Sequence, residues 1–195
     1  MMINVFDVEE RFDIQLNGIG SKELHGEISK RLNIEYLSDY LNTKELKEVT
    51  GIIYGYNIAI FVSLPVKVKH QVKNVHFLID TGSPRTYVCG EVYDSFKITV
   101  NNSTVPRVLI NSKPIFAHLS PNESHFTDIN VLGSEYLKLT GARLFANYED
   151  EDISILFESF NEDIQNIKVK TNFQVQENFQ LKPYTLDKFV GFCLF

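Results

Sequence analysis

The residues best suited to chemistry are a carboxylate and the turn residues that follow it, Asp80, Thr81, Gly82 and Ser83. They come directly after a largely apolar stretch, residues 75–79, which predicts a buried β-strand. A carboxylate at the end of such a strand must be held by hydrogen bonds or change its protonation state, because taking a charge out of water is costly. Gly82 permits a tight turn whose backbone N–H groups point back at Asp80. The motif therefore indicates acid–base chemistry at Asp80 or a purely structural Asx-type turn.

A second motif further along the chain favours the functional interpretation. Residues 129–132 form another apolar strand that ends at Gly133, and residues 135–140 fit a short helix. In this order the two motifs resemble those of the retropepsin-like aspartic proteases. There, a hydrophobic-hydrophobic-glycine segment is threaded as a ψ-shaped loop beside an Asp-Thr-Gly turn. The resemblance covers residues 52–157 and implies a mainly β fold, a pepsin-like β-barrel half-domain with a short helix after the ψ-loop glycine.

The resemblance also assigns roles to individual residues. Asp80 matches the catalytic aspartate, and Thr81 matches the residue whose hydroxyl forms a hydrogen bond across the twofold axis. Gly82 matches the glycine that donates to the carboxylate, with Ser83 beside it in the same turn. Gly133 matches the glycine that lets the ψ-loop strand approach closely. On this interpretation Thr81, Gly82, Ser83 and Gly133 support the turn and take no part in the chemistry.

Aspartic protease chemistry needs two carboxylates, and this chain supplies one Asp-Thr-Gly motif. In the family, one ionised carboxylate activates a water while its protonated partner polarises the scissile carbonyl, so the pair shares one proton. A single motif implies a homodimer in which each chain contributes Asp80 to a site on the symmetry axis. The sequence therefore predicts an aspartic endopeptidase that acts on peptides without a cofactor. The alternative is an inactive dimerisation or peptide-binding module with the same fold.

Retroviral members close a glycine-rich flap over the substrate, and the corresponding region here contains no glycine between Gly90 and Gly133. Ser134 and Glu135 replace the Arg-Asp or Arg-Asn pair that often follows the ψ-loop glycine. The dimer contact must then come from another segment, and residues 1–50 or residues 189–195 are the candidates. The predicted flap tip consists of Asn101, Asn102, Ser103, Thr104, Val105 and Pro106.

Changes in composition divide the chain into an N-terminal partly helical segment (1–50), the protease-like domain (51–157) and a C-terminal β tail (158–195). Apolar spacing predicts helices over residues 22–32 and 34–49 in the first segment, which could serve as a cap or bind a partner of its own. The other predicted elements are a hairpin from strands 3–6 and 12–16, strands 58–68, 87–88, 96–100, 108–110, 115–116, 144–148 and 153–157, and a turn at 149–152.

Composition excludes several other classes of protein. The chain has 195 residues and a net charge of -6, and nucleic-acid binding needs clustered basic residues. Its longest apolar run, residues 58–64, is far shorter than the ~20 residues that span a bilayer. Two cysteines, Cys89 and Cys193, are too few for a disulfide framework, so we expect free thiols in an intracellular, cytoplasmic setting. His118 and His125 belong to a polar loop, and we expect no metal site there.

Overall fold

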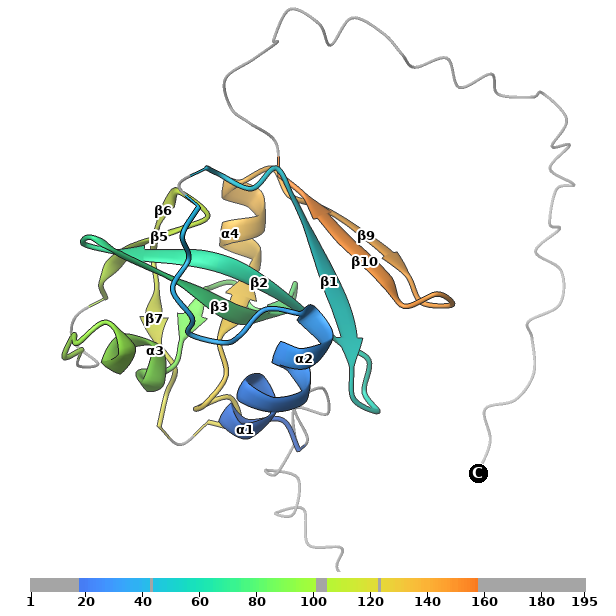
Figure 1. The fold of residues 1–195 in the computed structure, drawn as a ribbon, viewed down its shortest axis with the longest axis horizontal. Coiled ribbons are helices and arrows are strands. Elements are labelled where there is room, and N and C mark those ends of the chain that lie inside the picture. Colours follow the sequence, from blue (N-terminus) through green and yellow to red (C-terminus); the bar gives the residue numbers. More distant parts are fainter. Residues whose placement is uncertain (1–17, 43, 101–104, 123, 158–195) are drawn as a thin grey trace, which may run out of the picture. The chain divides into compact units, whose positions relative to one another are not determined.

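The computed structural model describes residues 18–42, 44–100, 105–122 and 124–157 (Figure 1). Within these residues the chain forms one ten-stranded sheet whose main path runs β7-β4-β8-β3-β2-β1-β10-β9, with β5 paired to β2 and β6 paired to β5. The strands are β1 (Glu48–Tyr54), β2 (Ala59–Val68), β3 (Gln71–Asp80), β4 (Tyr87–Val88), β5 (Arg107–Ile110), β6 (Lys113–Phe116), β7 (His118–Leu119), β8 (Val131–Gly133), β9 (Arg143–Asn147) and β10 (Asp152–Leu156). The helices are α1 (Ser21–Glu23), the π-helical η2 (Leu24–Ile28), α2 (Ser29–Leu32), α3 (Gly90–Ser95) and α4 (Ser134–Leu139).

The long hairpin of β2 and β3 is the centre of the fold. The two strands pair antiparallel from Phe61↔Leu78 to Val68↔Gln71. Most of β2 and the second half of β3 are buried, as continuous apolar runs predict for strands covered on both faces. This hairpin ends at Asp80, so the carboxylate stands at the edge of a rigid, well-packed element.

Strand β8 lies between β3 and β4. It runs parallel to β3, with Asp80 opposite Gly133, and antiparallel to β4, with Tyr87 opposite Val131. A parallel pair cannot be joined by a tight turn. The chain therefore leaves β3 at Asp80, forms β4 to β7, and returns to insert β8 beside the strand that it left.

The N-terminal segment packs onto the same core as the sheet. Helices α1, η2 and α2 form one continuous helical stretch, in agreement with the helix expected over 22–32. Figure 1 shows this stretch in blue below the central strands, with the next residues running up alongside them. Leu24, Ile28 and Tyr36 belong to the single hydrophobic core cluster of the described residues.

The prediction of a helix over residues 34–49 was wrong. Asn33 takes a left-handed conformation that ends α2, and Leu37 also has a positive φ. The backbone then pairs with the free edge of β3, where the N–H of Leu37 donates to the Asn74 carbonyl at 2.8 Å. Because β3 satisfies these backbone groups, Tyr36 reaches the core and Leu37 packs against it without a helix.

The prediction of a strand over residues 96–100 was also wrong. Helix α3 precedes it, and Phe96 caps the C-terminal end of that helix. The turn expected at 149–152 is present between β9 and β10, and the remaining strand predictions between residues 58 and 157 match strands at shifted bounds. The hairpin expected within residues 3–16 and the β tail 158–195 lie outside the described residues. In the part that the structure describes, none of the helices combines the length and apolar character needed to cross a membrane.

Candidate functional site

Asp80 is held by the turn that follows it. Its Oδ1 accepts hydrogen bonds from the backbone N–H groups of Gly82 at 2.8 Å and Ser83 at 3.2 Å. The Ser83 N–H also lies 3.2 Å from the Asp80 carbonyl oxygen, which closes the turn. These donors fix the orientation of the carboxyl group. Within the described residues its second oxygen, Oδ2, accepts no hydrogen bond, so it is available to a water or a substrate.

The turn faces outward. Asp80 is half-buried, while Thr81 and Gly82 are exposed. The Thr81 hydroxyl makes no hydrogen bond to any residue that the structure describes. A Cβ on Gly82 would lie 3.2 Å from Asp80 Oδ1, which is tight for that contact. The turn therefore presents a carboxyl oxygen and a hydroxyl on one open surface.

Gly133 lies against the back of this turn. A Cβ at this position would overlap the Arg85 carbonyl group and approach the Ser83 carbonyl oxygen to 2.9 Å. Its φ of -85° and ψ of 173° are open to any residue, so the requirement for glycine is steric and not conformational. The N–H of Gly133 also donates to the buried Thr86 hydroxyl at 3.3 Å. Strand β8 thus supports the Asp80 turn by direct backbone contact.

Ser134 and Glu135, which depart from the retroviral pattern, bond to the same loop. The Ser134 N–H and hydroxyl both donate to the Ser83 carbonyl, at 2.8 and 3.0 Å. Glu135 accepts the backbone N–H of Thr86 at 2.9 Å through Oε1. The start of α4 therefore braces the loop that follows Asp80.

Asn130 was missed by the sequence analysis, although it is a polar residue in an apolar run. Its side chain is fully buried. The Nδ2 group donates to the hydroxyl of Tyr36 at 2.8 Å and to the carbonyl of His76 at 3.0 Å, and Oδ1 accepts the N–H of Cys89 at 2.9 Å. One side chain thus joins the N-terminal segment, β3 and the residue that follows β4.

The predicted flap is only partly described. Residues 101–104 lie outside the described residues, so Asn101, Asn102, Ser103 and Thr104 remain a prediction. Val105 is partly exposed, and the Pro106 carbonyl accepts the N–H of Ala117 at 3.1 Å. These two residues lead directly into β5.

A small hollow of about 150 Å³ lies away from the Asp80 turn, with residues of the N-terminal segment on one side and of β2 and β5 on another. It includes neither Asp80 nor the residues of its turn. The rings of His118 and His125 contact Tyr87 and Phe126, respectively.

No protein-family model matches the chain, and no curated protein matches it. Among solved structures the chain is similar to a retropepsin-like aspartic protease from Rickettsia conorii. The two are 20% identical, and the match covers 60% of this chain and 95% of that chain with a TM-score of 0.38. The described residues form a mainly β structure with a single sheet and few helices, which is consistent with a retropepsin-like fold.

Proposed function

We propose that this chain is a retropepsin-like aspartic endopeptidase, active as a homodimer. The observation that supports this most directly is the Asp80 carboxyl group. It is oriented by two backbone N–H groups through Oδ1 and keeps Oδ2 unbonded within the described residues. Structural Asx turns also use one carboxyl oxygen, but they do not require a second strand to press against the turn as Gly133 does.

The mechanism needs a second carboxylate, and a second copy of the chain is the proposed source. With two Asp80 side chains facing each other, like charges disfavour double ionisation and one proton is shared. The ionised carboxylate takes a proton from water as the water oxygen attacks the scissile carbonyl carbon. The protonated partner donates to the carbonyl oxygen. Transfer of a proton to the amide nitrogen then accompanies cleavage of the C–N bond, which releases an acid and an amine.

The open face of the turn suits this arrangement. Thr81 is exposed and unbonded within the described residues, so its hydroxyl is free to bond to the same turn of a partner chain. An extended peptide would lie across the paired carboxyl groups and add a strand beside them. Neither a cofactor nor a nucleic acid enters this proposal.

Strand β9 offers an edge for the partner. Among the described residues it pairs only with β10, and all five of its residues are exposed. Leu144 is 38% and Phe145 is 52% exposed, and an apolar edge strand with open backbone groups is prone to pair with another chain. We therefore add the β9 edge to the candidate dimer contacts predicted from the sequence, residues 1–50 and 189–195.

Two measurements test the proposal. One is peptide cleavage at pH 3 to 7, with and without pepstatin, and the other is the mass of the protein from sedimentation. We expect pepstatin-sensitive cleavage by a dimer, and its complete loss in Asp80→Asn and Asp80→Ala without loss of the dimer. Asp128→Asn is the matched control, since Asp128 is exposed and should leave activity unchanged. Activity that survives either Asp80 change would exclude the mechanism. A folded dimer with no cleavage at any pH would favour the inactive binding module.

A further inference from the structure

A strap of residues 20–40 covers one side of β3. It begins with the helical stretch α1, η2 and α2 and ends as an added edge segment, in which the N–H of Tyr40 donates to the Val72 carbonyl at 2.9 Å. Lys73 reaches back from β3 to the Leu37 carbonyl at 3.1 Å and to Asp39 at 3.2 Å. The strap is therefore fastened along the strand that ends at Asp80.

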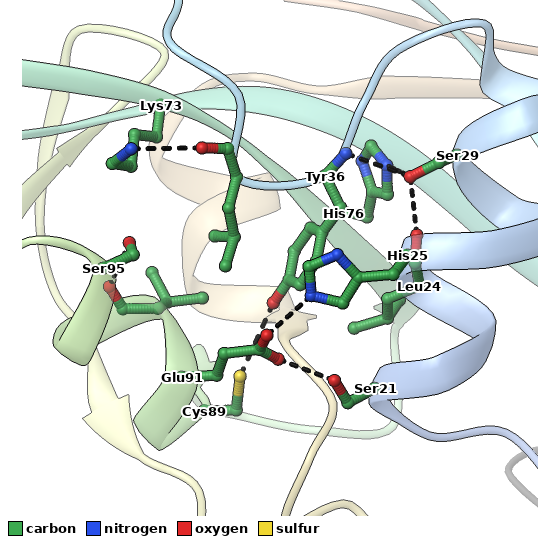
Figure 2. A network of polar contacts seen from close by, with 12 residues as sticks. Ser21, Leu24, His25, Ser29, Tyr36, Lys73, His76, Cys89, Glu91 and Ser95 are labelled. Atoms are coloured by element: carbon green, nitrogen blue, oxygen red, sulfur yellow. Dashed lines mark hydrogen bonds and ion pairs between the residues drawn. The ribbon is translucent and has the colours of Figure 1, made fainter.

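Tyr36 lies at the centre of the contact between the strap and the sheet. Only 2% of its surface is exposed. Figure 2 shows its side chain reaching from the strap toward Cys89, in the region between His25 and His76. Its ring centroid is 4.9 Å from that of His25 and 5.1 Å from that of His76. Its hydroxyl lies 3.5 Å from Cys89 Sγ and accepts the hydrogen bond from Asn130.

The Tyr36 hydroxyl is the acceptor for one of the two N–H bonds of the Asn130 side-chain amide. The Asn130 side chain is sealed from water, and its two N–H bonds go to Tyr36 and to the His76 carbonyl. Without the hydroxyl, one buried N–H loses its partner, and an unpaired buried donor is costly. The side chain would then turn or shift, and its bond to Cys89 would be disturbed.

Asn130 matters to the Asp80 turn because it directly precedes β8. Its own carbonyl accepts the N–H of Leu78 at 2.8 Å, which sets the register that places Gly133 opposite Asp80. A slip by one residue would bring a side chain into the position that only Gly133 can occupy beside the Arg85 carbonyl. The register of β8 and the shape of the turn are therefore linked.

The outer side of the strap is tied to α3. Glu91 of α3 lies 2.6 Å from His25 Nε2 through Oε1 and accepts the Ser21 hydroxyl at 2.7 Å through Oε2 (Figure 2). Helix α3 begins one residue after Cys89, which Asn130 holds from the inside. The strap thus contacts both the strand before the Asp80 turn and the helix after β4.

We propose that Tyr36 is a positioning residue for Asp80: the strap holds β8 in register through the bond from Asn130 to the Tyr36 hydroxyl. The consequence for turnover rests on the proposed protease function. The consequence for the shape of the turn does not, because it concerns the hydrogen bonds from Gly82 and Ser83 to Asp80.

Tyr36→Phe tests the proposal in the full chain, since it removes only the hydroxyl. Tyr40→Phe is the matched control. Tyr40 belongs to the same strap, and its buried hydroxyl has no hydrogen-bond partner among the described residues. We expect Tyr36→Phe to lower kcat roughly tenfold with KM nearly unchanged, because one buried hydrogen bond is comparable to the free energy behind a tenfold change in rate. Tyr40→Phe should keep both constants.

Amide hydrogen exchange, followed by NMR, provides the readout that needs no activity. In Tyr36→Phe the N–H groups of Gly82 and Ser83 should exchange several-fold faster than in Tyr40→Phe. Equal exchange in the two variants would overturn the proposal even if the wild type cleaves peptides. If the wild type cleaves no peptide but Gly82 and Ser83 still exchange faster in Tyr36→Phe than in Tyr40→Phe, the positioning role is upheld and only the proposed function is refuted.

Should Tyr36→Phe fail to fold, Glu91→Ala gives the same test from the exposed side of the strap. This change releases Ser21 and His25 from α3 without emptying a buried site. We expect faster exchange at Gly82 and Ser83 there too, by a smaller factor. Unchanged exchange in Glu91→Ala would contradict the proposal.

Discussion

Replacing Gly133 with alanine tests the contact on which the whole site depends. The new methyl group would overlap the Arg85 carbonyl and lie 2.9 Å from the Ser83 carbonyl oxygen. Both obstacles are backbone atoms, which cannot rotate away as a flexible side chain would. The backbone angles of Gly133 suit alanine, so the entire cost comes from this overlap.

Adding an atom to a tightly packed interior typically costs ~1–3 kcal/mol, and a clash with backbone belongs at the upper end of that range. We expect Gly133→Ala to lower the free energy of unfolding by about 3 kcal/mol, which corresponds to a fall in melting temperature of roughly 6–12 °C for a domain of this size. To relieve the clash, β8 must move away from the loop after Asp80, so exchange of the Gly82 N–H should also accelerate.

Urea unfolding of Gly133→Ala, with Gly26→Ala as control, measures this effect. A Cβ on Gly26 meets no atom within 4 Å, so this helical substitution should stabilise the protein by ~0.5–1 kcal/mol. The opposite signs separate a general effect of glycine replacement from the contact at Gly133. An unfolding free energy of Gly133→Ala equal to that of the wild type would refute the close approach of β8 to the Asp80 turn.

Two further predictions concern acid stability and self-association. Burial lowers the pKa of His76 from 6.5 to about 4, and the nearby His25 lowers it further. The Ile34 backbone opposes this shift, although Nδ1 of His76 has no hydrogen-bond partner among the described residues. Because the unfolded chain takes up this proton at a higher pH than the folded one, stability should fall by roughly 3 kcal/mol between pH 6.5 and 4. Urea unfolding across this range should show a shallower pH dependence in His76→Gln, and an unchanged slope would contradict the assignment. Phe145→Asp should weaken the dimer at least about tenfold in sedimentation equilibrium, because it places a charge in the proposed β9 contact. Tyr56→Ser, a change at a fully exposed aromatic residue, is the control, and equal dissociation constants for the two variants would exclude the β9 edge.

Much of the sheet was predictable because its strands are dictated by local pattern. The buried run before Asp80, the apolar strand before Gly133 and the acidic turn of the β9–β10 hairpin are each visible within a few residues. Where the prediction failed, a distant partner decided the structure. Residues 34–49 have helical spacing, yet residues 37–40 pair with the free edge of β3 and residues 48–49 begin β1.

The polar residues of the interior show the same division. Asn130, His76 and Ser29 each stand out as polar residues, but nothing in the sequence tells which groups they meet. Ser29 lies 3.0 Å from His76 Nε2 and also receives the N–H of Tyr36. The contact between Ser29 and His76 joins residues far apart in the chain, so it depends on how the strap crosses β3.

By itself, the sequence determined which groups are available: one Asp-Thr-Gly motif, a turn that can aim N–H groups at its aspartate, and a glycine in a second apolar strand. These are local properties, because turn geometry and strand burial follow from neighbouring residues. The tertiary structure decided that Gly133 presses on the Asp80 turn, that α4 braces it, and that Tyr36 supports β8 through Asn130. Such contacts depend on register and on close approach of backbone, which no short stretch of sequence encodes.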